Sequence, residues 1–97
     1  MGRSEKRELV NRLNILLLHL FKWRFQPARR SRSWEVSIAN TRDDLTDHLA
    51  DNPTLKATLA DAMEKAYRRA RRNASIETGL AESVFPVDCP WTFEQAM

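Results

Sequence analysis

Residues 9–25, LVNRLNILLLHLFKWRF, carry apolar side chains at the spacing of an amphipathic helix. Ser4 is the expected N-cap, and Glu5 suits the positive end of the helix dipole. Pro27 disfavours helical angles at the residue before it, so the helix should end near Phe25. One broad arc of this helix is predicted to face the core, and it comprises Leu9, Val10, Leu13, Leu16, Leu17, Leu20, Phe21 and Trp23.

The same helix has apolar residues on its other side. Ile15 and Leu18, with Phe25 near them, project among polar residues away from the core arc. A helix that is apolar on two faces needs cover from two directions, and an uncovered apolar patch on a small protein is an association site. We therefore expect Ile15, Leu18 and Phe25 to form an assembly face.

Two further helices are predicted after a basic connector at residues 26–32. Ser31 or Ser33 caps the second helix, and its inward stripe comprises Trp34, Ile38, Thr41, Leu45, His48 and Leu49. Asn52-Pro53 is expected to start the third helix and Gly79 to end it. The inward arc of the third helix is rich in alanine, which lets a neighbouring helix approach closely: Leu55, Leu59, Ala62, Met63, Ala66, Ala70 and Ala74.

The last part of the chain combines prolines with aromatic residues. Phe85-Pro86 and Cys89-Pro90-Trp91 predict an irregular strap over the helices, and Thr92 with Gln95 predicts a capping box for a short last helical turn. No segment alternates in the manner of a strand. The expected fold is all-α, a single domain over residues 1–97, built as a bundle of three main helices with a C-terminal strap.

Composition argues against several classes of function. A chain of 97 residues is long enough for one small core only. Because it has only two glycines, it cannot form a glycine-rich phosphate-binding loop. A lone Cys89 forms no internal disulfide, and with only His19 and His48 it cannot complete a zinc site. We expect no metal and no cofactor, and a reducing cytoplasm as the location. The longest apolar run, residues 15–21, is shorter than the ~20 residues that span a bilayer, so no membrane association is expected.

Charge is distributed unevenly along the chain. The net charge is +3, yet residues 1–32 carry nine bases and two acids, whereas residues 33–64 carry two bases and seven acids. Such asymmetry indicates either that the two segments face each other or that the basic one meets an anionic partner. The bases near Trp23 and Trp34 are candidate nucleic-acid contacts, namely Lys22, Arg24, Arg29, Arg30 and Arg32. We favour the alternative, in which both tryptophans anchor the helix junction.

Glu77 interrupts the apolar arc of the third helix, and Arg24 interrupts that of the first. A buried charge is tolerated chiefly when it is paired, so Glu77 is expected to pair with Arg24, Arg29 or Arg30. The functional alternative is a catalytic cleft lined by Glu77 and these arginines.

Segments along the whole chain resemble the bacterial family known as domain of unknown function 29. The matching segments are MGRSEKREL (1–9), LLLHLFKW (16–23), QPARRSRSW (26–34), AYRRAR (66–71), ETGL (77–80), FP (85–86) and CPWT (89–92). The resemblance implies an all-helical bacterial protein with no established activity, substrate or cofactor.

One departure from that family bears on assembly. Its members usually begin with a further helical segment, and residues 1–4 resemble the point where that segment leads into the long helix. Without it, Ile15 and Leu18 stay uncovered, so either two copies cover each other or the start is a fragment boundary. The expected function is a non-catalytic interaction or self-assembly module, a homo-oligomer with a dimer favoured, or the ligand of a helical protein. Nucleic-acid binding through residues 22–34 is the alternative, and an enzyme with a Glu77–arginine cleft is third.

Overall fold

The structure, a computed structural model, describes residues 2–97. Its helices are α1 (Gly2–Phe25), α2 (Arg32–Asp51), α3 (Leu59–Thr78) and the short α4 (Phe93–Ala96). Short 3₁₀ turns lie at Pro27–Arg29, Pro53–Thr58 and Glu82–Val84. No strand occurs among these residues, so the predicted all-α fold with three main helices and a short last helix is confirmed. No helix in the part described is both long and apolar enough to cross a bilayer.

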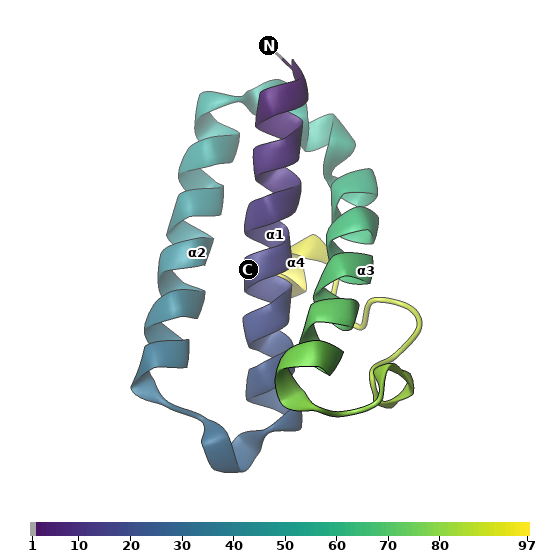
Figure 1. The fold of residues 1–97 in the computed structure, drawn as a ribbon. Helices are drawn as coiled ribbons and strands as arrows, with labels where there is room; N and C mark the ends of the chain where they lie inside the picture. Colours follow the sequence, from purple (N-terminus) through teal and green to yellow (C-terminus); the bar gives the residue numbers. More distant parts are fainter. Residues whose placement is uncertain (1) are drawn as a thin grey trace.

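Helix α1 occupies the centre of the arrangement. Figure 1 shows α2 on one side of it and α3 on the other, with α4 behind. Helix α2 is antiparallel to α1, and α3 is antiparallel to α2, so α1 and α3 run in the same direction. The contacts of α1 are most extensive with α3 and then with α2. The side of α1 turned toward the viewer in Figure 1 has no helix in front of it.

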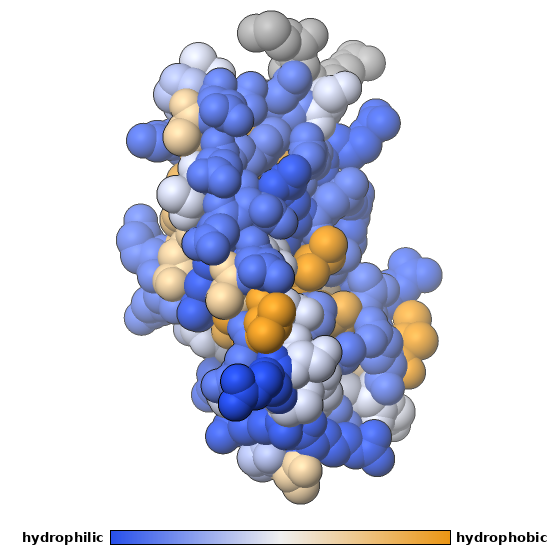
Figure 2. All heavy atoms as spheres, turned by 90° about the vertical axis from the view of Figure 1, so that its left-hand side faces the viewer, coloured by the Kyte–Doolittle hydropathy of each residue, from blue (hydrophilic) through white to orange (hydrophobic). Residues whose placement is uncertain are grey.

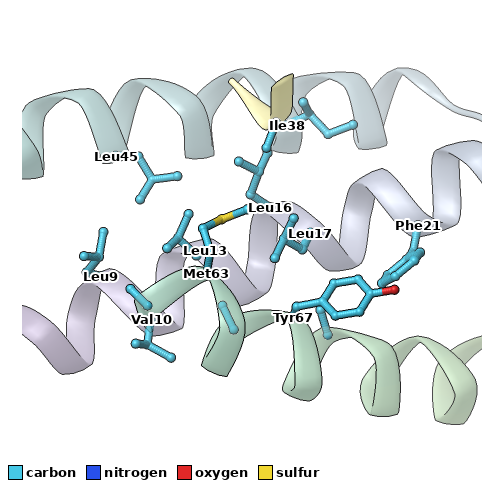
Figure 3. Packing of buried hydrophobic residues seen from close by; sticks show 14 of the residues in the cluster. Leu9, Val10, Leu13, Leu16, Leu17, Phe21, Ile38, Leu45, Met63 and Tyr67 are labelled. Carbon is cyan, nitrogen blue, oxygen red and sulfur yellow. The ribbon is translucent and has the colours of Figure 1, made fainter. Parts of the chain in front are cut away.

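The core lies between the inward faces of the three long helices. Leu9, Leu13, Leu16, Leu17 and Phe21 are fully buried, and Figure 3 shows them pointing from α1 toward α2 and α3. Burying a leucine or phenylalanine side chain contributes about 1.5–3 kcal/mol, so this one row supplies much of the stability. On α3, three alanines in the predicted arc are also fully buried, and they are Ala66, Ala70 and Ala74. Leu20 and Trp23 of the predicted α1 arc are only partly buried.

Local capping signals set most helix ends. The Ser31 side chain accepts the Trp34 backbone N–H, Gly79 closes α3 with φ 75°, and Thr92 with Gln95 forms the predicted capping box. Two predicted starts are wrong. Ser4 is not the N-cap of the first helix, because α1 begins at Gly2 and already includes Ser4. The Asn52 side chain makes no cap, because its amide donates to the His48 carbonyl at 3.0 Å, and residues 53–58 form a 3₁₀ turn before α3.

The C-terminal strap crosses the bundle on aromatic side chains. The Phe21 ring lies 4.9 Å from Phe85 and 5.2 Å from Trp91, between ring centroids. Phe85 is 1% exposed, and its carbonyl accepts the Arg71 Nε–H at 3.1 Å. These contacts tie the irregular residues 85–91 to both α1 and α3.

Candidate functional site

Ile15 is the most exposed apolar residue of the predicted assembly face. Its side chain is 45% exposed on the side of α1 opposite the buried leucines. Leu18 is partly buried against the edge of the core, and Phe25 packs on Phe85 with ring centroids 5.1 Å apart. The expectation that all three project together is therefore corrected for Phe25, because the strap passes over it. At helical spacing from Ile15, the outward face of α1 also carries Ser4, Glu8, Asn11, Leu18 and Lys22.

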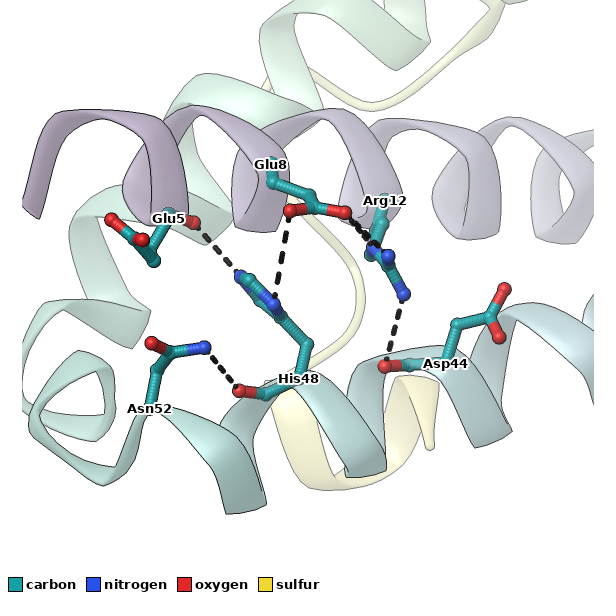
Figure 4. A network of polar contacts seen from close by, with 6 residues as sticks. All are labelled: Glu5, Glu8, Arg12, Asp44, His48 and Asn52. Carbon is teal, nitrogen blue, oxygen red and sulfur yellow. Dashed lines mark hydrogen bonds and ion pairs between the residues drawn. The ribbon is translucent and has the colours of Figure 1, made fainter. Parts of the chain in front are cut away.

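A polar network fixes α1 to α2 along one border of this face (Figure 4). Arg12 donates from Nε to the Glu8 carboxylate at 3.1 Å and from Nη1 to the Asp44 carbonyl at 3.2 Å. The hydrogen bond and the positive charge of Arg12 hold the pKa of Glu8 below its usual value. His48 is buried, and its Nε2 donates to the Glu5 carbonyl at 2.9 Å, while its Nδ1 lies 4.0 Å from Glu8. These contacts fix the position of α2 along the axis of α1.

Two contacts fix α1 to α3 along the opposite border. Arg69 donates from Nη1 to Asn11 Oδ1 at 3.4 Å, and Lys22 Nζ lies 2.5 Å from Glu77 Oε1. Glu77 thus pairs with Lys22 and with none of the predicted arginines, and it is 44% exposed rather than buried. The reason is geometric, since Lys22 projects toward the end of α3 whereas Arg24 extends over Phe25 and Trp91. Arg24 is itself exposed, so it does not interrupt a buried arc.

The surface on either side of α1 is strongly polar. Exposed acidic residues lie on α2, and they include Asp44, Asp47 and Asp51. Exposed basic residues lie on α3, and they include Lys65, Arg69 and Arg72. Figure 2, which views the molecule from the α2 side, shows a mainly hydrophilic surface with a few separate apolar side chains. An apolar centre with a charged border is the composition of many protein interfaces.

Three of the five candidate nucleic-acid contacts, Lys22, Arg24 and Arg30, are engaged with their own chain. Lys22 lies 5.9 Å from the Trp34 ring centroid, and Arg30 lies 4.9 Å from the Trp23 ring and donates to the Trp23 carbonyl at 2.7 Å. Arg29 and Arg32 are exposed. Trp23 and Trp34 are both partly buried, so neither offers a free stacking platform.

A groove that the sequence did not predict lies between α3 and the strap. It has a volume of about 830 Å³ and includes Tyr67, Arg68, Arg72, Asp88 and Cys89 in its lining. Burial raises the pKa of the Cys89 thiol, which donates to the Trp91 carbonyl at 3.1 Å and is therefore a poor nucleophile. A smaller groove of about 320 Å³ lies between the start of α3 and residues 91–94. Glu77 lines neither groove, and no group of three metal-ligating side chains occurs within residues 2–97.

Tyr67 closes the inner wall of the larger groove, and its ionisation is a direct test of this packing. Its side chain is 3% exposed, its hydroxyl donates to the Pro86 carbonyl, and burial raises its pKa to about 12. An ultraviolet titration of the phenol, which reports this residue alone because the chain has one tyrosine, should give a midpoint near 12. The chain unfolded in urea should titrate near 10.

The same pKa difference predicts how stability changes in alkali. A group whose pKa is raised in the folded state stabilises the fold below its unfolded pKa and loses that contribution as pH rises through the folded pKa. The free energy of unfolding should therefore fall between about pH 10 and pH 12. Tyr67→Phe, the matched control, should lack this part of the decline. A folded-state midpoint near 10 would contradict the buried environment.

Comparison with known proteins shows the family of the chain. A family model described as "Domain of unknown function DUF29" matches residues 1–97. No curated protein and no solved structure matches the chain.

Proposed function

The chain belongs to the family described as domain of unknown function DUF29, and since that description names no activity, we propose from the surface of α1 that the domain is a non-catalytic self-assembly module. In this proposal two copies form a homodimer through the outward face of α1. The observation that carries it is the position of Ile15, which is 45% exposed at the middle of the longest helix, directly opposite the core. Burying a side chain of this kind against its equivalent favours association.

The borders of the face support the same proposal. Arg12 holds Glu8 and the Asp44 carbonyl on one side, and Arg69 holds Asn11 on the other. Side chains that are already held by neighbours lose less conformational freedom on binding, so a rigid surface binds at lower entropic cost. Around Ile15 these polar groups would form the solvated border that commonly surrounds an apolar interface centre.

The two other candidate functions have less support from the described residues. Nucleic-acid binding would use residues 22–34, but three of the five candidate bases, Lys22, Arg24 and Arg30, contact groups of their own chain. Catalysis at Glu77 would need a cleft shared with the connector arginines, whereas Glu77 pairs with Lys22 at the surface. If the protein does not retard DNA or RNA in a gel at low salt, nucleic-acid binding is excluded, because phosphate contacts are strongest at low salt.

The test is the mass of the chain in solution. Sedimentation velocity or light scattering over a concentration series should give a dimer for the natural chain and a monomer for Ile15→Glu, with Kd raised by roughly 100-fold because a carboxylate replaces the apolar centre. Val84→Glu is the matched control, since Val84 is 47% exposed in the turn Glu82–Val84 and lines neither groove, and this variant should remain dimeric. Circular dichroism should show all three chains equally helical. A monomeric natural chain at every concentration would overturn the proposal.

A further inference from the structure

The two borders of the assembly face carry opposite charge. On α2, Asp44, Asp47 and Asp51 are exposed at spacings of three and four residues, which places them along one side of the helix. On α3, Lys65, Arg69 and Arg72 are exposed at the same spacings. The contacts of Asp44 with Arg12 and of Arg69 with Asn11 place one member of each row beside the outward face of α1, on opposite sides of it. The basic residues also line the groove between α3 and the strap.

The two rows also lie at matching heights along α1. The Asp44 carbonyl accepts from Arg12, and Arg69 donates to Asn11, so both residues lie beside the same turn of α1. Because α2 runs opposite to α1 and α3 runs along it, Asp47 and Asp51 lie nearer the start of α1, and so does Lys65. His48, next to Asp47, confirms this direction, since it contacts Glu5.

These rows select one arrangement for a dimer. We propose that the two copies are related by a two-fold axis parallel to α1, so that α2 of each copy lies over α3 of the other. This inference rests on the proposed self-assembly. A rotation about such an axis exchanges the two sides of the face without changing height, so each acidic row meets a basic row. A two-fold axis lying across α1 would instead place α2 over α2 and α3 over α3, where like charges repel.

The central pair of this arrangement is Asp44 of one copy with the partner's Arg69. The network in Figure 4 uses the main-chain carbonyl of Asp44 and leaves its carboxylate outside the Arg12 contact. Arg69 contacts Asn11 through one guanidinium nitrogen and presents others to solvent, so it can bind a carboxylate while keeping that contact. Asp47 would then meet the partner's Lys65 one turn away, and Asp51 lies one turn further on. Ile15 of each copy meets its equivalent between the two charged rows. Glu8, which is paired with Arg12, and Lys22, which is paired with Glu77, meet their equivalents on either side of it.

Charge reversal tests this geometry separately from assembly itself. In Asp44→Arg and in Arg69→Asp, two like-charged pairs would meet across the interface, so each single variant should raise the dimer Kd by about tenfold or more at low salt. The double variant Asp44→Arg/Arg69→Asp restores opposite charges and should return the Kd to within about threefold of the natural chain. Added salt should shrink all of these differences, because the pairs lie at the border of the interface.

Glu35→Arg is the matched control, because it makes the same charge change on α2 at an exposed position away from the acidic row. Its Kd should equal that of the natural chain, and thermal melts should show that every variant is folded. Single reversals that leave the dimer Kd unchanged would overturn the parallel axis, even if Ile15→Glu still gives a monomer. A double variant whose dimer Kd is as high as that of the single variants would overturn it as well. A natural chain that is always monomeric would overturn both this geometry and the proposed function.

Discussion

Replacing Phe21 with alanine is expected to lower the free energy of unfolding by about 4 kcal/mol, which is about a quarter or more of the stability of a typical small domain. The Phe21 ring is fully buried and lies 5.4 Å from Tyr67, 4.9 Å from Phe85 and 5.2 Å from Trp91, between ring centroids. Its removal therefore leaves a cavity where α1, α3 and the strap meet. Urea unfolding followed by helical circular dichroism measures the loss.

The aromatic contacts predict a second consequence of the same variant. Because Phe85 and Trp91 both rest on the Phe21 ring, the strap should loosen before the helices unfold, and tryptophan fluorescence should change ahead of the helical signal. Val87→Ala, at a 78% exposed position on the same strap, is the control and should stay within about 0.5 kcal/mol of the natural chain. A Phe21→Ala chain with an unchanged urea midpoint would contradict the packing of the strap.

Ala70→Leu should cost about 3 kcal/mol, through crowding rather than through a cavity. Ala70 is fully buried on α3, between the equally buried Ala66 and Ala74, and α3 has its most extensive contacts with α1. A leucine side chain at this position must push the two helices apart or adopt a strained rotamer. The urea midpoint should fall while the dependence of free energy on urea stays the same.

The control for crowding is Ala50→Leu, an exposed position on α2, where the change should be within about 0.5 kcal/mol. If Ala70→Leu were as stable as the natural chain, space for the extra carbons would exist between α1 and α3, and the close approach would be refuted. Both outcomes are read from the same unfolding curves.

The sequence predicted features whose physical cause lies within a few residues. Ser31 begins α2 through a hydrogen bond of its side chain, and Gly79 ends α3 through its positive φ angle. Thr92 and Gln95 cap α4 through two reciprocal hydrogen bonds. The periodicity of apolar residues likewise predicted the buried row of α1. Asn52 shows the limit of this approach, because its amide has a second local acceptor, the His48 carbonyl, and takes it instead of capping.

The path of the strap was not predictable from periodicity, and several other differences follow from it. Residues 85–91 pass over the side of α3 that carries Tyr67 and over the end of α1 that carries Phe25. Tyr67 is therefore buried although it lay outside the predicted inward arc, and Phe25 is covered although it was expected on the assembly face. The ion-pair partner of Glu77 was not predictable either. It depends on how far long side chains reach from one helix to the next, and the spacing of residues along one helix does not determine this reach.

The contact between Phe21 and Phe85 joins residues more than sixty positions apart in the chain. During translation, at about 5–20 residues per second, Phe21 leaves the peptidyl transferase centre roughly 3–13 seconds before Phe85 has been added. For that interval the nascent helix has no strap to shelter its aromatic end. Once this end of α1 has left the ribosomal exit tunnel, its aromatic side chains would therefore be accessible to a molecular chaperone until the strap has followed.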